Sequence, residues 1–444
     1  MKGMIQILKA SALLLACLST GITQAQVSPD QRIDNLRPYD KSGINIFDSP
    51  KDTNAVFNGL KLKFGAGFTQ AFQALEHKNT SGGLYRMSPG FNTANANLYM
   101  DVQLADGIRL NLTSYLSSRH HNETWVKGGY IQFDKLPFKG QVWDNIMKVT
   151  TIKIGHMEIN YGDQHFRRSD GGHTLYNPFV ENYILDGFTT EIGGEVLVRK
   201  NSLFGLLGVS NGMIKGNIDS LIPTPVDDNI HKSPALYVKG GFDRQLTRLF
   251  RARLAASYYT NNSSGGQTLY AGDRTGSNYF MPMEKLGSTA SSNFSSGRLN
   301  PGFSKRVDAF QLNGFIKVQG FELFGTYEAA KGRSKDEASD RNVKQYAVDG
   351  VYRFGKNESL FLGVRYNAVT ARLADVAETA TSPAIVYTND MKVDRVAVGA
   401  GWFLTSNIML KGEYVTQKYK DLPVADYRDG GKFNGYVVQA VVGF

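Results

Sequence analysis

A period-two alternation of apolar and polar residues runs through most of the chain. Residues 60–73 show it first, since leucine, alanine and phenylalanine there alternate with lysine, glycine, threonine and glutamine. Successive side chains of a strand point to opposite faces, so one face of this segment suits lipid and the other suits water. A water-soluble β-sandwich alternates in the same way. The number and the length of such segments must therefore distinguish the two classes.

We predict sixteen such strands. Nearly all span about 10 to 15 residues, longer than the usual strands of globular sheets and long enough to cross a bilayer at a tilt. An even number is typical of bacterial barrels made from one chain. The predicted strands cover residues 60–73, 93–105, 108–119, 124–137, 148–158, 186–199, 202–213, 233–245, 248–260, 305–319, 321–331, 343–355, 359–372, 392–404, 407–419 and 434–444.

The connections between these strands alternate in length. Short turns such as 105–107 and 319–320 are rich in turn-forming residues, whereas long polar connections cover 214–232, 261–304, 332–342, 373–391 and 420–433. Short periplasmic turns and long outer loops are the arrangement of outer-membrane barrels. We therefore predict an all-β fold, a transmembrane antiparallel β-barrel of about 16 strands over residues 57–444. One connection on the short side, 138–147, is longer than this arrangement predicts.

The N-terminus reads as a targeting segment. Lys2 and Lys9 precede or border the apolar run 10–18, and a small-residue cleavage site follows at residues 23–25, so we expect a signal peptide over residues 1–25. A competing interpretation takes residues 14–17 as a lipoprotein signal, with Cys17 bearing the lipid. Residues 26–56 then form a periplasmic arm, a linker or a plug of the lumen. The expected location is the outer membrane, with its lipid as one partner.

The net charge and the absence of known enzyme motifs reduce the number of functional classes to consider. The net charge is +10, and removal of residues 1–25 takes away two lysines and no acidic residue, which leaves +8. For an exported barrel, such a balance favours anionic solutes or lipid over nucleic acid, which we do not expect as a partner. No nucleotide loop, zinc-protease motif or hydrolase elbow occurs. We expect no enzyme, no cofactor and no metal site.

The C-terminal strand carries a complete alternating row. The chain ends on an aromatic residue, and apolar or aromatic residues precede it at every second position. This row is similar to the terminal strand by which the outer-membrane assembly machinery recognises its clients. The predicted assembly signal comprises Tyr436, Val438, Ala440, Val442 and Phe444.

The central part of the chain resembles the phosphate-selective porins of the outer membrane. The resemblance lies in the glycines Gly155 and Gly162 with the short run between them, in residues 177–185 and in the strand 190–198. This family tends to have a proline two positions before the second glycine, where this chain has Asn160. The chain also lacks an obvious ladder of arginine and lysine along one strand. Both departures weigh against phosphate specificity and leave the porin interpretation intact.

The resemblance implies that the third outer loop, residues 159–185, folds into the lumen and narrows it. The predicted constriction residues are His165, Arg167, Arg168, Asp170 and Glu181. Guanidinium groups grip anions in a fork geometry and would set the selectivity there. Alternatively, the two arginines are solvated or pair with Asp170 and Glu181. The basic residues expected on the pore wall are Lys61, Lys63, Arg109, Arg251, Arg253, Arg365, Arg395 and Lys411.

These observations lead to two functional hypotheses. The first is a porin that lets small polar solutes diffuse, with a weak preference for anions, and the resemblance implies a homotrimer. The second is a structural or assembly-associated barrel whose lumen is occluded by the N-terminal arm or by residues 261–304. Conductance across a planar bilayer separates them.

Overall fold

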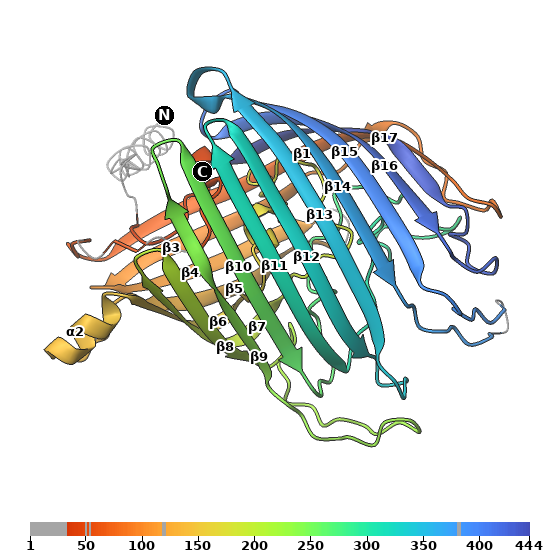
Figure 1. Cartoon of the computed structure of the whole chain (residues 1–444), viewed down its shortest axis with the longest axis horizontal. Coiled ribbons are helices and arrows are strands. Elements are labelled where there is room, and N and C mark those ends of the chain that lie inside the picture. Colours follow the sequence, from red (N-terminus) through yellow and green to blue (C-terminus); the bar gives the residue numbers. More distant parts are fainter. Residues whose placement is uncertain (1–32, 49–50, 53–54, 118–120, 380–382) are drawn as a thin grey trace, which may run out of the picture.

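A computed structural model describes residues 33–48, 51–52, 55–117, 121–379 and 383–444. The expected signal peptide, Cys17 and the first part of the expected arm lie outside the described residues. The described chain forms a closed antiparallel barrel of sixteen strands, with the two-residue strand β2 in addition (Figure 1). The predicted fold class is confirmed.

The strands follow one another around the barrel in chain order. They coincide with the predicted segments, and the largest difference lies in the first, which continues to Lys78. Their bounds are β1 Lys61–Lys78, β2 Gly90–Phe91, β3 Asn95–Ala105, β4 Ile108–Ser117, β5 His121–Phe133, β6 Thr150–Glu158, β7 Thr190–Lys200, β8 Leu203–Ser210, β9 Ala235–Gln245, β10 Phe250–Asn261, β11 Arg306–Val318, β12 Phe321–Arg333, β13 Arg341–Phe354, β14 Leu360–Ala371, β15 Met391–Phe403, β16 Ile408–Lys420 and β17 Lys432–Gly443.

The first and last strands close the barrel. β1 pairs with β17 from Gly67 opposite Gly443 to Lys78 opposite Lys432. Beyond the end of β17, Ala66 and Phe444 exchange two backbone hydrogen bonds of 3.0 Å. On its other side, β1 pairs with β3 and with the short β2. Closure pairs the edge groups that an open sheet would leave exposed, which is a requirement for a sheet within lipid.

The two faces of the wall are inverted relative to a water-soluble protein. On β13, Gln345 and Asp349 are buried, whereas Tyr346 and Val348 on the other face are 55% and 48% exposed. The buried face looks into the barrel and carries Gln345 and Asp349 among smaller apolar residues, whereas large apolar and aromatic side chains lie on the exposed face. A sandwich in water would bury its apolar face. This polarity settles the ambiguity that the alternation left open.

The connections agree with the predicted alternation at most positions. The unexpectedly long connection after β5 contains the helix α2, Gln141–Met147, and three short 3-10 helices occupy Lys41–Gly43, Gln164–Arg167 and Lys356–Glu358. Below, the end of the barrel that carries the short turns is called the short-turn end. In the described ranges, no helix combines the length and the apolar character that crossing a membrane requires.

Three segments lie inside the barrel. They are the N-terminal segment (residues 33–48), the lumen segment (residues 159–189) and the long loop (residues 262–305). The expectation that residues 261–304 form an outer loop was wrong for most of their length. Tyr270 and Tyr279 donate hydrogen bonds from their hydroxyls to Glu328 of β12 and Glu413 of β16, and this draws the loop inward. Residues 285–293 stay largely exposed.

The predicted assembly row lies on the outer face of β17 and at its end. Tyr436, Val438 and Phe444 are 50%, 45% and 51% exposed, Ala440 is exposed and Val442 is half-buried. The row therefore faces outward at the seam with β1. Its recognition by the assembly machinery stays a prediction.

Candidate functional site

The lumen segment is held by hydrogen bonds to side chains of the barrel wall. The backbone amides of Ile184 and Leu185 donate to Asn367 of β14 and Gln345 of β13 at 2.6 and 2.9 Å. The ammonium group of Lys411 on β16 donates to three carbonyl oxygens of the segment at 2.8 to 2.9 Å. Buried backbone groups without a strand partner need such bonds. The inward-facing polar side chains thus supply the hydrogen-bond partners that a neighbouring strand would give to the backbone of a regular strand.

Two glycines allow the lumen segment to touch the opposite wall. A Cβ on Gly172 would lie 2.5 Å from the Cα of Ala96 on β3. A Cβ on Gly67 of β1 would lie 3.0 Å from the Cα of His173. Backbone therefore meets backbone here, which any larger residue at Gly172 would prevent. The segment is fixed on both sides of the barrel.

Arg167, one of the predicted constriction residues, is buried and paired. Its guanidinium lies 3.4 Å from Glu322 of β12 and also donates a hydrogen bond to Asn45 of the N-terminal segment. It also lies 5.2 Å above the ring of Phe324. The charge of Arg167 is thus matched by a wall carboxylate, and only 3% of the residue is exposed. It joins the lumen segment to both the wall and the N-terminal segment.

Arg168, the second predicted arginine, is held by three carboxylates. Its nitrogens lie 2.6 Å from Asp186, 2.7 Å from Asp273 and 3.0 Å from Asp170. Its guanidinium stacks 3.6 Å above the ring of Phe188. Although burial opposes the charge, these acids raise the pKa of Arg168 well above its ordinary value. The pairing with Asp170 is one of the two alternatives that the sequence left open.

Glu181 belongs to the same charge cluster through a different arginine. Arg298 of the long loop lies 2.7 Å from both Glu181 and Asp273 and 3.1 Å from Asp186. Burial raises the pKa of Glu181, but Arg298 and Arg395 outweigh it and hold that pKa below its ordinary value. Two arginines and their acids therefore clamp the lumen segment to the long loop.

The N-terminal segment lies across part of the short-turn end of the lumen. Tyr39 stacks on Tyr99 of β3 with ring centroids 3.9 Å apart, and its hydroxyl lies 3.2 Å from Asp101. Asp48 lies 3.0 Å from Arg253 of β10. A backbone hydrogen bond of 2.9 Å joins Lys41 to the short turn after β15. Of the three interpretations of the arm, these contacts favour the plug for the described part.

Most of the predicted pore-wall cations lie on the inner face and have partners. Arg109 pairs with Asp134 at 2.7 Å, Arg251 with Asp243 at 2.6 Å and Arg365 with Asp349 at 2.7 Å. Arg253 binds Asp163 at 2.8 Å, and Arg395 donates a hydrogen bond to Gln417 at 2.7 Å. Lys61 is half-buried, and the ammonium group of Lys63 lies 5.8 Å from the ring of Tyr39. Their part in conduction stays a prediction.

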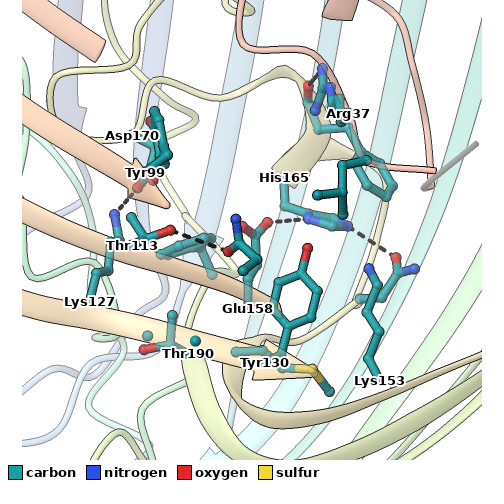
Figure 2. Close-up of a pocket in the computed structure, with 18 of the residues that line it drawn as sticks. Arg37, Tyr99, Thr113, Lys127, Tyr130, Lys153, Glu158, His165, Asp170 and Thr190 are labelled. Carbon is teal, nitrogen blue, oxygen red and sulfur yellow. Dashed lines mark hydrogen bonds and ion pairs between the residues drawn. The ribbon is translucent and has the colours of Figure 1, made fainter. Parts of the chain in front are cut away.

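A cavity of about 240 Å³ remains between the lumen segment, the N-terminal segment and the strands β3 to β7. Figure 2 shows many of the side chains that line it. Lys127 of β5 binds Asp170, and the imidazole of His165 lies between Glu158 and Asn160. The cavity thus brings three of the five predicted constriction residues, His165, Arg168 and Asp170, to one surface.

The charges that face this cavity are mixed. The side chains of Glu158, Asp170 and Lys153 are 39%, 26% and 20% exposed. Burial lowers the pKa of His165 despite the neighbouring Glu158. The residues that sequence reasoning missed here are Arg37, Lys127, Lys153 and Glu158. Of these, Arg37 and Glu158 flank predicted segments but carry no motif that would single them out.

A second cavity of about 450 Å³ opens at the short-turn end. Basic side chains from several turns and strands line it, among them Lys41, Arg248 and Lys317, opposite Glu322 and Glu358. In the described residues, no cluster of three or more His, Cys, Asp or Glu side chains is arranged to hold a metal ion.

Comparison with known proteins shows similarity of structure and none of sequence. No protein-family model matches the chain, and neither does any curated protein sequence. The anion-selective porin from Comamonas acidovorans aligns with a TM-score of 0.52 at 10% identity, over 87% of this chain and 100% of that chain. The outer membrane channel DcaP of Acinetobacter baumannii gives 0.47 at 13% identity, over 87% and 98%. OmpT, an outer membrane protein of Vibrio cholerae, gives 0.48 at 11% identity, over 88% and 99%.

Sequence identities this low support a similarity of fold only, and no similarity of function. The similarity to the Comamonas porin agrees with the closed antiparallel wall. The chain is an outer-membrane β-barrel with a porin-like fold.

Proposed function

We propose that the chain is a channel for small polar solutes that pass beside the lumen segment, along the wall formed by β3 to β7. The observation that carries this proposal is the 240 Å³ cavity on that side, lined by polar and charged side chains. It is far larger than the roughly 10–15 Å³ that admits one water. Apart from the second cavity at the short-turn end, the lumen segment, the long loop and the N-terminal segment fill most of the rest of the barrel.

The lining supports a weak charge preference. Arg37 and Lys153 offer positive charge to an anion, whereas Glu158 and Asp170 offer negative charge to a cation. The weak anion preference that the composition favours is part of this proposal. A phosphate preference, which the resemblance implies, would need cations without acids beside them, but Lys127 binds Asp170 and Lys153 lies 3.8 Å from Glu195.

Conductance across a planar bilayer tests the proposal. Folded protein should give steps well below those of an open sixteen-stranded porin, because the path is confined to one side of the lumen. A folded, heat-modifiable preparation that gives no steps, where a known porin does, would contradict it.

A second candidate is a structural or assembly-associated barrel with an occluded lumen. The three inserted segments support it, since the N-terminal segment covers part of the short-turn end through Lys41, Tyr39 and Asp48. Deletion of residues 33–48 separates the candidates. Steps in the wild type favour the channel, whereas steps that occur only after the deletion favour the occluded barrel.

The proposed role of Arg167 and Arg168 needs its own test. Because both charges are matched by carboxylates, we infer that they hold the lumen segment in place more than they select ions. Arg167→Gln with Arg168→Gln should raise the conductance and its noise. A shift of the reversal potential toward cations at unchanged conductance would assign them direct selectivity instead.

Assembly and oligomeric state belong to the same proposal. Phe444→Ser should reduce insertion without affecting export, because it removes the terminal aromatic from the row on β17. A control at the outer-face residue Val364 of β14, Val364→Ser, should insert normally. We also propose a homotrimer, for which cross-linking in native membranes is the measurement.

A further inference from the structure

The helix α2 stands apart from the rest of the barrel. It lies in the connection between β5 and β6, and Figure 1 shows it projecting beyond the ends of these strands. Neighbouring short turns of the barrel, such as 105–107, need only a few residues. The connection that contains α2 is therefore longer than a turn between two neighbouring strands requires.

One face of α2 is apolar and exposed. Val142, Trp143 and Ile146 are 69%, 42% and 44% exposed, and they fall within an arc of about 100° because successive helix residues are rotated by about 100°. Asp144 lies on the opposite side of the helix. Phe138, which precedes the helix and is 57% exposed, packs against Trp143 with ring centroids 5.7 Å apart. Four large apolar side chains thus form one patch.

This patch follows closely in the chain on the lipid-facing surface of the barrel. Ile131 of β5 and Ile154 of β6 are paired in register and are 39% and 55% exposed, so they belong to the outer apolar face. Ile131 lies two residues before the end of β5, and the connection that carries Phe138 and α2 begins there. The helix therefore lies close to the end of the outer apolar face on β5.

The charges around the patch suit a phospholipid surface. Lys139 and Lys148 are exposed at the two ends of the helix, and Lys135 is exposed nearby, where it pairs with Asp106 at 2.9 Å. Lysine beside an apolar face with tryptophan is the composition of helices that lie in the membrane interface. The lysines can reach phosphate groups while the apolar side chains enter the acyl boundary.

We propose that α2, together with Phe138, is an interfacial anchor seated in the phospholipid leaflet next to the short-turn end. A lipid surface fits better than a protein partner, because a stable protein interface buries roughly 1,200–2,000 Å² and a seven-residue helix offers much less. The anchor holds the wall where it is paired least. β5 and β6 share only the five pairs from Gly129 opposite His156 to Phe133 opposite Ile152.

Tryptophan fluorescence of the whole barrel tests the anchor. The chain has three tryptophans, so Trp125→Phe with Trp402→Phe leaves Trp143 as the only reporter. In vesicles of phosphatidylethanolamine and phosphatidylglycerol with brominated acyl chains, Trp143 should lose most of its emission. Aqueous iodide should quench it little. The matched control adds Trp143→Phe and Asp144→Trp, which moves the reporter to the opposite face and should reverse both results.

The possible outcomes are distinct. Quenching of Trp143 by iodide but not by brominated lipid would overturn the proposal, because the helix would then lie in water. Protection from both quenchers would overturn it in favour of a protein contact, such as a second copy of the chain. If the reporter variants fail to become heat-modifiable, Val142→Asn with Ile146→Asn in the otherwise wild-type chain provides the second measurement. Brominated lipid should then quench less of the total emission than in the wild type, and equal quenching would overturn the proposal.

Discussion

The two sides of the barrel differ in regularity. The long-ladder wall, β10 to β17, has neighbouring strands paired almost end to end, as in β11 and β12 from Arg306 opposite Arg333 to Val318 opposite Phe321. The cavity wall, β3 to β7, has register shifts on both sides of β4 and the short pairing of β5 with β6. The lumen segment is bound to the long-ladder wall through Asn367, Gln345 and Lys411, whereas the 240 Å³ cavity beside this segment lies against the cavity wall.

This difference suggests where a barrel with segments inserted into its lumen can keep a path for solutes. Regular strands present inward side chains at a constant spacing, which can satisfy the backbone of an inserted segment. Irregular strands interrupt that spacing, and beside them a cavity remains between the lumen segment and the wall. The solute path that we propose therefore follows the least regular part of the wall.

The largest expected effect comes from the charge cluster that clamps the lumen segment to the long loop. Asp273→Asn should destabilise this packing by about 3 to 5 kcal/mol, because it removes a buried partner of Arg168 and Arg298. Trypsin cleavage of the folded barrel within residues 159–189 measures the loosening. Asp421→Asn is the control, since Asp421 pairs with Lys392 at 2.8 Å on the surface and should cost less than about 1 kcal/mol. Equal cleavage of both variants would contradict the clamp.

A matched pair of lysines compares the two walls directly. Lys411→Met should destabilise the barrel by about 3 kcal/mol, since three buried carbonyl oxygens lose their donor. Lys153→Met on the cavity wall should cost less than about 1 kcal/mol, because Lys153 is partly exposed and lies 3.8 Å from Glu195. The temperature at which each barrel loses its heat-modifiable mobility measures the difference. A larger decrease of that temperature for Lys153→Met would mean that the cavity wall, and not the long-ladder wall, holds the lumen segment in place.

Acid should loosen the contact between the lumen segment and the N-terminal segment. Burial lowers the pKa of His173 to about 4, and its Nε2 lies 2.7 Å from the carbonyl oxygen of Tyr39. The folded state therefore binds fewer protons than the unfolded state, whose histidine pKa is about 6.5. The stability from neutral His173 is complete above about pH 6.5 and is lost as the pH falls toward 4, by at most about 3 kcal/mol.

Protease accessibility of residues 33–48 across that pH range measures this effect. Arg37 and Asp170 are the charged groups nearest to the imidazole and act in opposite directions. His173→Gln should abolish the part of the pH dependence that lies between 6.5 and 4. An unchanged profile would assign the acid sensitivity to other groups.

The smallest expected effect concerns ion selectivity. Lys153→Met should lower the anion-to-cation permeability ratio by about two-fold, which corresponds to roughly 0.4 kcal/mol, because the charge lies beside the proposed path. Lys331→Met should leave the ratio unchanged, since the side chain of Lys331 is 56% exposed on the outside of the wall and is screened over about 8 Å. Reversal potentials in a salt gradient give both values. Equal shifts would mean that ions do not pass along the cavity wall.

The sequence by itself determined the wall of this protein. The side chains of a strand alternate between its faces whatever lies beyond them, so local alternation predicted strands such as 343–355 and 392–404 within two residues of β13 and β15. It also assigned Tyr346 and Val348 to one face and Asp349 to the other, as observed. The prediction of a transmembrane barrel also placed the polar face toward the lumen, and the burial of Asp349 agrees with it.

Only the tertiary structure decided what fills the lumen. The partners of Arg167 and Arg168 include Asn45, Asp273 and Glu322, which lie far from them in the chain. Local patterns carry no information on such pairings, because any lumen carboxylate could have neutralised either arginine. The cavity is likewise the volume that three inserted segments leave unoccupied. That volume depends on the packing of the whole barrel, and no single stretch of sequence specifies it.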